Sequence, residues 1–364
     1  MRADIHRFAL TDPSDVSGLA KAIEGGTVDP STIVAVIGKT HGNGLVNDYT
    51  RGYLTLCLSI LIGEASARSP ETIREQIPFI FSGGTEGVLS PHYTVFTVAE
   101  DGAVPVAEEK ALAIGVSFTL PMRPSDIGRQ AQIDAIAAAV TEAVAKSGIE
   151  EVHYVQVKGP AFSLADIVED QKAGRRPASD NSGKLMGFGR GASALGVAAA
   201  LGEIPRDKAV ESAVLKDFSL FSSVASMSAG IEIRCNEVVV VGMSSRWTGP
   251  LAIEHTTMSD ALDIGSVQAM LQRLGFPAAP QIATPARIRA AFIKCEASRD
   301  GQVRGKPHTM LNDGDINEQR HIRGAVGAIC ASILNDTALF VSGGAEHQGP
   351  DGGGMIAVVA EKAA

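Results

Sequence analysis

"FSGGTEG", residues 81–87, and "FVSGGAEHQGP", residues 340–350, repeat one short pattern near opposite ends of the chain. In each, an apolar residue or run leads into Ser-Gly-Gly, and a glutamate follows four residues after the serine. A middle counterpart, "SAGIE", begins at Ser228 and keeps the glutamate spacing. Three copies of one pattern indicate an internally repeated fold, since self-similarity along a chain is the signature of repeated structural units.

An apolar, β-branched run that ends in lysine also occurs three times. The runs read "TIVAVIGKT", "EVHYVQVKGP" and "IRAAFIKCEA", and their lysines are Lys39, Lys158 and Lys294. Runs of this length and composition predict buried strands, each with its lysine near one end. Further along each third, small residues follow an arginine, at Arg51, Arg190 and Arg323. Small residues at helical spacing favour a helix that packs closely on a sheet.

A helix start precedes each of these strands. Pro-Ser-Asp stands ahead of an apolar helical pattern in "TDPSDVSGLAKAIEGG" and in "MRPSDIGRQAQIDAIAAAV", and "MSDALDIGSVQAMLQRLG" is a fainter third copy. These letters predict helices that begin directly after the Ser-Asp step. There, a side-chain oxygen accepts hydrogen bonds from the free N–H groups of the first turn.

The order lysine, arginine, serine is therefore kept three times. The sets are Lys39/Arg51/Ser82, Lys158/Arg190/Ser228 and Lys294/Arg323/Ser342. The arginine and serine are separated by 31, 38 and 19 residues, which places the differences in length in loops. We predict an α/β protein of three structurally similar units, residues 1–105, 106–250 and 251–364, around a pseudo-threefold axis.

Composition and charge favour a small-molecule partner. The chain has 364 residues, a formal net charge of -9, and no apolar stretch near the roughly 18 residues of a membrane span. The N-terminal segment lacks a secretory apolar core, so a cytoplasmic protein is expected, with no membrane partner. An acidic balance disfavours nucleic acid. Four scattered cysteines without a CxxC motif indicate reduced thiols rather than disulfides or a zinc site.

The repeated polar residues favour a functional site over a purely structural repeat. The apolar positions change among Val, Ile, Leu and Ala between the copies, whereas the lysine, arginine and serine stay identical. Polar groups at the ends of buried strands cost stability unless something uses them. "GKTHGNG", residues 38–44, looks like a phosphate loop but lacks the GxxxxGK[ST] spacing, so nucleotide binding is not expected.

Paired lysines and serines predict nucleophilic chemistry. Serine is a poor nucleophile until a base removes its proton, and a neutral lysine does this in Ser-Lys enzymes. The pKa of a free lysine is about 10.4, and burial and neighbouring cations lower it. A central cavity that collects three lysines and three arginines supplies such cations. Its complement is a small, flat, partly anionic ring with several outward carbonyl oxygens. The residues alone do not single out one of the three pairs.

Longer segments resemble one known family. "VIGKTHGNGLVNDYTRGY", "FSGGTEGVLSPHYTVF", "VQVKGP", "GRGASALG", "SAGIE", "RGKPHTMLNDGDIN" and "VSGGAEHQGPDGGG" closely resemble the cyanuric acid amidohydrolases, which share an architecture with the barbiturases. The resemblance covers essentially the whole chain, in order. It implies the Toblerone fold of three units around a central site. It also implies hydrolytic opening of cyanuric acid to carboxybiuret, which loses carbon dioxide to give biuret, in s-triazine degradation.

The resemblance further implies roles for individual residues. It assigns Lys158 as the base and Ser228 as the nucleophile. The positions that match substrate-holding residues are Arg51, Ser82, Gly83, Arg190, Ser228, Ala229, Arg323, Ser342 and Gly343, together with Lys39 and Lys294 of the other two pairs. The middle copy departs from the pattern because it reads Ser-Ala-Gly and has Ser226 two residues ahead. The glutamate spacing selects Ser228.

A metal and an assembly state are implied in the same way. The resemblance implies no cofactor for catalysis, but a bound Mg²⁺ or Ca²⁺ with a structural role. The matching positions are Glu296, Ala345, Gln348, Gly349, Pro350 and Gly353. It also implies a homotetramer.

Two alternative functions stay open at this point. A barbiturase would use the same residues on barbituric acid, in which a ring CH2 replaces one imide NH. A non-catalytic small-molecule binding protein could also be built from three α/β units, and it would bind a ring without forming a product.

Overall fold

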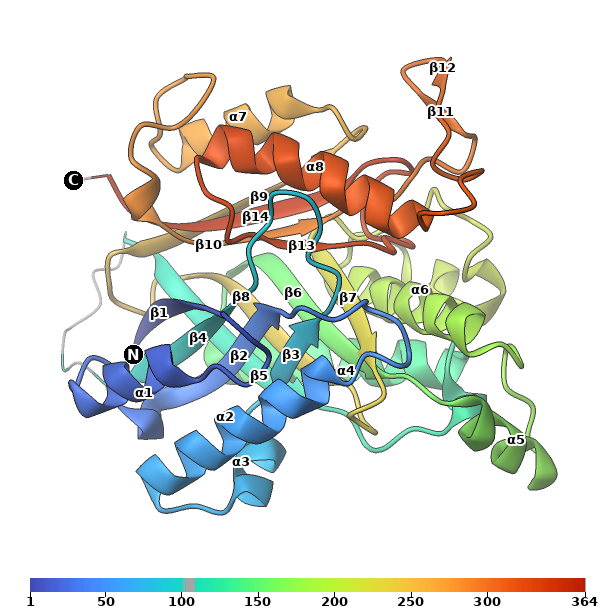
Figure 1. Ribbon diagram of the computed structural model, residues 1–364, viewed down its shortest axis with the longest axis horizontal. Helices are drawn as coiled ribbons and strands as arrows, with labels where there is room; N and C mark the ends of the chain where they lie inside the picture. The colour runs from blue at the N-terminus through green and yellow to red at the C-terminus, as the bar shows by residue number, and fades with distance from the viewer. Residues whose placement is uncertain (101, 103–108, 364) are drawn as a thin grey trace.

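Three four-stranded sheets with one shared strand order form the centre of the protein (Figure 1). The computed structural model describes residues 1–100, 102 and 109–363. In spatial order, the sheets are β1 (Arg2–Ala9), β4 (His92–Ala99), β2 (Ile33–Lys39) and β3 (Phe79–Ser82); β5 (Ala111–Phe118), β8 (Glu237–Ser244), β6 (Glu151–Pro160) and β7 (Ala225–Gly230); and β9 (Leu251–Met258), β14 (Gly354–Glu361), β10 (Ile288–Lys294) and β13 (Phe340–Ser342). We call them the first, second and third sheets.

The pairing within the sheets is also the same. In each sheet, the first three strands pair antiparallel and the last pair is parallel. Each sheet has one register shift near the start of its third strand in spatial order, between Ile33 and Ala35, between Val152 and Tyr154, and between Ile288 and Ala290. One β-α-β-α-β-β path is therefore used three times, which confirms the predicted α/β fold of three similar units.

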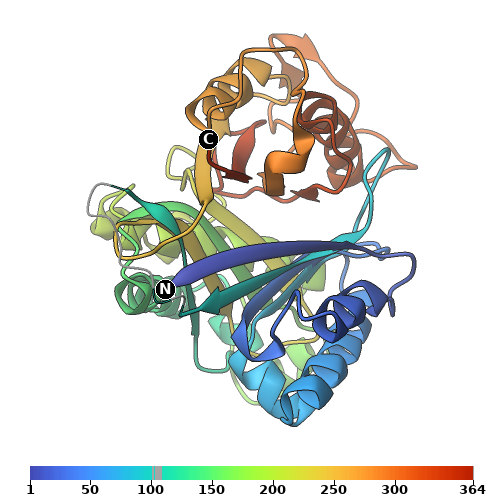
Figure 2. The same cartoon turned by 90° about the vertical axis from the view of Figure 1, so that its left-hand side faces the viewer.

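Helices connect the strands and lie on the outer side of the sheets (Figures 1 and 2). The connections from the first to the second strand along the chain contain α1 (Ser17–Glu24), α4 (Gln130–Ser147) and α7 (Ile264–Arg273). The connections to the parallel strand contain α2 (Thr50–Ser66) with α3 (Pro70–Gln76), α5 (Leu164–Lys172) with α6 (Ser182–Ala200), and α8 (Glu318–Leu334). A short hairpin of β11 (Gln302–Val303) and β12 (Lys306–Pro307) extends from the third unit. In Figure 2 the blue, green and orange-red parts occupy three corners around a common centre.

The predicted division of the chain is not tested in full. The boundary between residues 105 and 106 lies outside the described residues, and β9 begins at Leu251, the first residue of the predicted third unit. The ranges 1–105, 106–250 and 251–364 therefore stay predictions.

Two of the predicted helix starts are displaced along the chain. Pro124, Ser125 and Asp126 form a separate 3-10 turn, and α4 begins only at Gln130. The cap of α7 is Asp263, whose carboxylate accepts a hydrogen bond from the N–H of Ser266, not the earlier Ser-Asp step. Proline at the first position suits a 3-10 turn as well as an α-helix, because its missing N–H is unpaired in both. In the first unit, by contrast, α1 begins at Ser17, whose N–H donates to Asp15 Oδ1 at 3.1 Å, so the Ser-Asp step does lie at the start of that helix.

The core between the sheets is continuous. Strand β8 is buried at every position, as expected for a strand covered by helices on one face and by the other sheets on the opposite face. Phe292 of the third sheet stacks on Tyr154 of the second, with ring centroids 4.4 Å apart, and on Phe96 of the first, at 6.2 Å. One aromatic side chain therefore contacts all three sheets.

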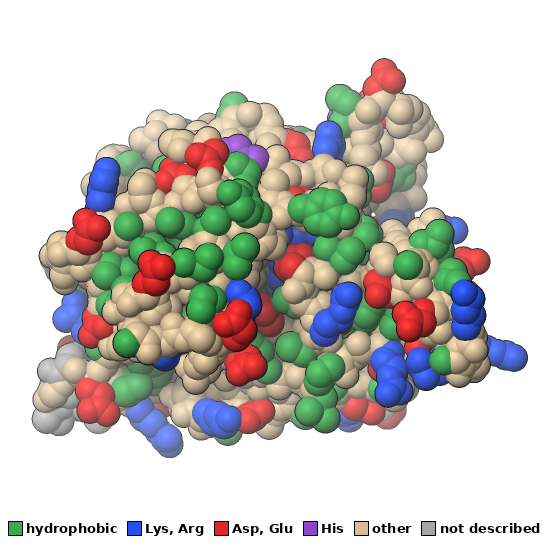
Figure 3. Space-filling view, turned by 60° about the horizontal axis from the view of Figure 1, so that its bottom comes forward, with side chains coloured by type: hydrophobic (Ala, Val, Ile, Leu, Met, Phe, Trp, Pro, Cys, Tyr) green, Lys and Arg blue, Asp and Glu red, His purple; other side chains and the backbone are tan. Residues whose placement is uncertain are grey.

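The helices and one face of the surface bear on membrane spans and charge. No helix within the described ranges is long and apolar enough to cross a membrane. On the face shown in Figure 3, lysine and arginine side chains are mixed with aspartate and glutamate side chains. Cys57, Cys235, Cys295 and Cys330 are free thiols, as the sequence predicted.

We predict that Phe292→Ala lowers the free energy of unfolding by about 3–5 kcal/mol, because it leaves a cavity where the three sheets meet. Urea denaturation followed by circular dichroism measures this change. Leu120→Ala is the control: Leu120 is 85% exposed, and its truncation should change stability by less than about 0.5 kcal/mol. A loss below about 1 kcal/mol for Phe292→Ala would contradict the view that this contact joins the sheets.

Candidate active site

Strand register brings each predicted lysine beside its serine. Lys39 pairs with Ser82, Lys158 with Ser228 and Lys294 with Ser342, each across the parallel strands of one sheet. Directly paired residues on one face of a sheet have Cβ atoms about 5 Å apart, which lets a lysine reach a neighbouring hydroxyl. The three pairs predicted from the repeat are therefore real neighbours.

One small cavity collects most of the predicted site. It is lined by Arg51, Ser82, Gly83, Arg190, Ser228, Ala229, Arg323, Ser342 and Gly343, and also by Gly44, Met186, Met227 and Gln319. All nine of the predicted arginine, serine and small residues are in this lining. The three lysines are fully buried, and two of them bond the serines that line the cavity. Residues from three distant parts of the chain thus enclose one space, and not three separate ones.

Lys39 and Lys294 make similar contacts. Lys39 Nζ lies 3.3 Å from Ser82 Oγ and donates to the carbonyl oxygen of Gly83 at 2.7 Å. Lys294 Nζ lies 3.1 Å from Ser342 Oγ and donates to Gly343 O at 2.9 Å. In both units, the lysine is held against its own serine.

Lys158 differs from the other two lysines. Its Nζ donates to Phe81 O, at 2.7 Å, and forms a short ion pair with Glu232 Oε1. Ser228 Oγ instead accepts a hydrogen bond from Gln156 Nε2 at 3.4 Å. The structure brings Lys158 and Ser228 together by register, but the amine binds a carboxylate rather than the serine. Ser226 bonds Gln156 Oε1 and does not line the cavity.

Three arginine–glutamate pairs join the units in a ring. Arg323 forks onto both oxygens of Glu86, and Arg190 forks onto both oxygens of Glu346. Arg51 Nε lies 3.2 Å from Glu232 Oε1. Each arginine therefore reaches the glutamate of a different unit: first to second, second to third and third to first.

These glutamates are the part of the site to which the sequence gave no role. Their signal was the constant spacing of four residues after each serine. Spacing alone could not reveal their partners. Each glutamate pairs with an arginine more than 150 residues away along the chain, and only the folded chain brings the two together.

Burial shapes the electrostatics of the lysines. Desolvation and the charge of Arg323 hold the pKa of Lys39 well below its usual value. Desolvation and Arg190 lower the pKa of Lys294 to about 7. Desolvation also lowers the pKa of Lys158, while Glu232 opposes the shift and Arg51 adds to it. Each lysine is thus closer to the neutral, basic form than a solvated lysine would be.

The departure of the middle copy has a steric reason. A Cβ on Gly83 would lie 1.8 Å from a carboxylate oxygen of Asp48, and one on Gly343 would lie 3.0 Å from Arg323 and from Gln319. The third equivalent position is Ala229, and its methyl group is accommodated at the cavity wall. A side chain is thus excluded at Gly83, tightly confined at Gly343 and tolerated at Ala229.

The residues predicted for a metal lie on two adjoining segments, Glu296 just after β10 and the others in the loop between β13 and β14. Glu296 N donates to Gly353 O at 3.3 Å, Gly353 N to Pro350 O at 3.1 Å, and Gln348 N to Ala345 O at 2.9 Å. Gly349 adopts φ +101°, a conformation that favours glycine. Carboxylate, amide and carbonyl oxygens are the donors that Mg²⁺ and Ca²⁺ prefer. The described residues contain no group of three or more His, Cys, Asp or Glu that could hold a metal.

The donor set fits a cation electrostatically. Burial, with Glu346 nearby, raises the pKa of Glu296 to about 7, a penalty that a bound cation would relieve. Arg299 Nη2 lies 2.6 Å from Glu296 Oε1, and Gln348 Oε1 accepts from Met227 N at 2.6 Å. Both side chains thus already have protein partners, and further oxygens for a cation would have to come from the backbone carbonyls of the loop.

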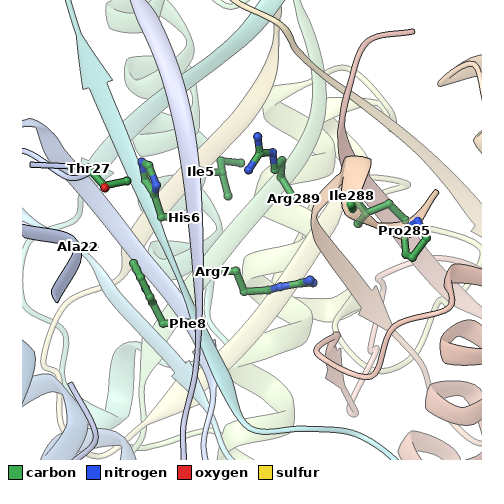
Figure 4. Close-up of a pocket in the computed structure, with 10 residues that line it drawn as sticks. Ile5, His6, Arg7, Phe8, Ala22, Thr27, Pro285, Ile288 and Arg289 are labelled. Atoms are coloured by element: carbon green, nitrogen blue, oxygen red, sulfur yellow. The ribbon is translucent and has the colours of Figure 1, made fainter. Parts of the chain in front are cut away.

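A second cavity, between β1 and the start of β10, lacks this chemistry (Figure 4). Its two arginines, Arg7 and Arg289, are paired with Asp336 and Glu361. It contains none of the predicted site residues, so the cavity that holds the serines is the better candidate for catalysis.

A family model for the amidohydrolase ring-opening proteins matches residues 4–361. The chain belongs to this family. It is therefore an enzyme of the hydrolase class, as the sequence resemblance predicted.

Individual relatives of the ring-opening amidohydrolase are similar over their whole length. A cyanuric acid amidohydrolase of Enterobacter cloacae is 44% identical over 370 residues, covering 100% of both chains. Another, from Pseudomonas sp. (strain ADP), is 46% identical and covers 98% of each chain. A solved cyanuric acid hydrolase, described as a product of structural concatenation, matches with a TM-score of 0.94 and 46% identity over 99% of each chain. The cyanuric acid hydrolase of A. caulinodans matches with a TM-score of 0.92 at 42% identity, over 100% of this chain and 99% of its own.

Proposed function

We propose that this enzyme opens the ring of cyanuric acid by hydrolysis, giving carboxybiuret, which decarboxylates to biuret. The observation that carries the proposal is a single cavity lined by three serines and three arginines in a threefold arrangement. Cyanuric acid presents three equivalent carbonyl groups and is partly anionic, so it complements such a cavity in symmetry and charge. The names of the similar enzymes support the same substrate.

The proposed nucleophile is Ser228 and the proposed base is Lys158. Ser228 Oγ attacks one ring carbonyl while its proton passes to the lysine amine, and the ring C–N bond then breaks as the nitrogen takes that proton. Water later releases the acyl group. The arginines and the other two lysine–serine pairs hold the remaining carbonyl oxygens and stabilise their charge. Gly83, Ala229 and Gly343 leave room for backbone N–H groups to approach those oxygens.

The other proposals concern the setting of the enzyme. We place it in the cytoplasm as a homotetramer in s-triazine degradation, without a cofactor in the chemical step. The oxygens at Glu296, Ala345, Gln348, Gly349, Pro350 and Gly353 would hold Mg²⁺ or Ca²⁺, whose contribution is to fix the turn that carries Glu346 beside Arg190.

The first test is the substrate itself. Purified enzyme and cyanuric acid should yield biuret and carbon dioxide, detected by liquid chromatography and by carbonate release. A parallel reaction contains barbituric acid, because one relative, 43% identical, carries only the broader name of cyclic amide hydrolase. Calorimetric binding of cyanuric acid without any product would show a binding protein and refute the proposal, and faster opening of barbituric acid would change the substrate.

The second test concerns the reacting pair. Ser228→Ala and Lys158→Ala should each lower kcat by about 10³-fold or more, because each removes a group on which bond formation depends. Ser82→Ala, the matched change in the first unit, should keep more activity and mainly raise KM. Steady-state kinetics with cyanuric acid measures both constants. Equal losses of kcat in Ser228→Ala, Ser82→Ala and Ser342→Ala would remove the assignment of one nucleophile.

The third test concerns the metal. Adding Ca²⁺ or Mg²⁺ to chelator-treated protein should raise the midpoint of thermal unfolding, because the folded state alone offers the complete donor set. Glu296→Gln should abolish most of that rise, while Glu361→Gln, on the distant pair with Arg289, should preserve it. An unchanged midpoint in the native sequence would argue against a metal at this turn.

A further inference from the structure

Glu232 is engaged differently from the two glutamates that repeat it. Both oxygens of Glu86 bond Arg323, and both oxygens of Glu346 bond Arg190. Glu232 instead offers Oε1 to Lys158 and to Arg51, and its buried Oε2 has no hydrogen-bond partner among the described residues. Of these three carboxylates, Glu232 alone contacts a lysine of the catalytic set. It contacts the lysine whose serine is the proposed nucleophile.

The cause of the difference is the position of Arg51. Its Nη2 donates to Leu45 O at 3.0 Å and its Nη1 lies 3.8 Å from Asp48. These contacts turn the guanidinium away from a forked pairing with Glu232, so that only Nε faces the carboxylate. Because Arg51 does not bond both oxygens of Glu232, this carboxylate can bind the buried amine of Lys158.

We propose that Glu232 is a positioning residue of the reaction, which orients Lys158 and stabilises the ammonium that forms on it as Ser228 loses its proton. This inference rests on the proposed function. Glu232 acts through Lys158 and does not line the cavity that holds the serines. Its part resembles that of the buried acid behind a catalytic histidine, which stays ionised while its partner becomes charged. The proposal also supplies a reason for the middle pair to react.

The proton balance is simple. Above its pKa, Lys158 has released the proton of the resting ammonium to water. In the attack, the Oγ–H bond of Ser228 breaks, an N–H bond forms on Lys158, an Oγ–C bond forms and the carbonyl electron pair moves to oxygen. The ammonium later gives the same proton to the ring nitrogen as the C–N bond breaks. Glu232 remains a carboxylate throughout.

A third cavity, separate from the two described above, borders Glu232. Glu232 and Glu237 line it together with Phe79 and the solvent-exposed residues Glu75 and Arg234. Lys158 is the cross-strand partner of Glu237. The Lys158 amine is itself fully buried, but its partner Glu232 borders this cavity.

The direction of the pH effect follows from the surrounding charges. The charged groups around Glu232 and Lys158 are Arg51 on α2, Asp48 ahead of it, Glu237 on β8, and Arg74, Glu75 and Arg234 around the third cavity. Burial lowers the pKa of Lys158, Glu232 raises it and Arg51 lowers it further. Removing the charge of Glu232 should lower the pKa of Lys158, so the neutral amine persists to lower pH.

The test is kcat as a function of pH, with saturating cyanuric acid, for four forms of the enzyme. Glu232→Gln should lower kcat by about 10²-fold or more and move the acidic limb of the profile to lower pH. Glu232→Asp keeps the negative charge on a shorter side chain. It should therefore retain the acidic limb of the wild-type profile and have an intermediate kcat. Glu86→Gln, the matched change in the first unit, should keep the limb and mainly raise KM. The substrate's own ionisation is common to all four forms.

Two results from folded Glu232→Gln and Glu86→Gln enzymes would overturn the inference directly. One is a Glu232→Gln enzyme with the kcat and acidic limb of the wild type, and the other is the same drop and shift in Glu86→Gln. Thermal unfolding shows which variants are folded. If the Glu232→Gln variant does not fold, a Glu232→Asp enzyme with the kcat of the wild type overturns the inference. In a Glu237→Gln background, adding Glu232→Gln should still move the acidic limb of the kcat–pH profile to lower pH. If it does not move, the effect belongs to Glu237. A wild-type enzyme that leaves cyanuric acid intact would instead refute the proposed function.

Discussion

The ring of three arginine–glutamate pairs is the constraint on which the rest of the structure depends. Each pair crosses from one unit to another, and all six side chains are largely buried. A buried charge without its partner costs several kcal/mol, so no unit can present its arginine to the cavity unless a second unit supplies the carboxylate. The site is therefore a property of three units together, since each unit alone would lack the partner of its arginine–glutamate pair.

The sheets make this arrangement possible by repeating one topology. The second and third strands along each unit run parallel, so their carboxyl ends meet at one edge and place a lysine beside a serine. Three such edges converge at one cavity because the sheets share a core around Phe292. The packing of the core thus also determines the site, since the contacts that hold the three sheets together fix the distances between the three serines.

Symmetry of the fold does not produce symmetry of the chemistry. Two lysines contact their serines, and the third contacts a carboxylate. Small local contacts, such as those of Arg51 with Leu45 and Asp48, are enough to change the partner of a buried amine. In a low-dielectric setting, the change of partner alters both the position and the proton affinity of that amine. A triplicated site can therefore divide one reaction into unequal roles without losing its overall shape.

The sequence by itself determined the triplication, the α/β class, the buried strands and the three lysine–serine pairs. It could do so because strand periodicity and repeated polar residues are local properties of the chain, and parallel neighbours bring equivalent strand ends together. The start of α4 was displaced because Pro-Ser-Asp suits a 3-10 turn as well as an α-helix. Only the tertiary structure decided which arginine meets which glutamate and that Lys158 binds Glu232. Those choices depend on how three units pack against each other, and no spacing within one unit contains that information.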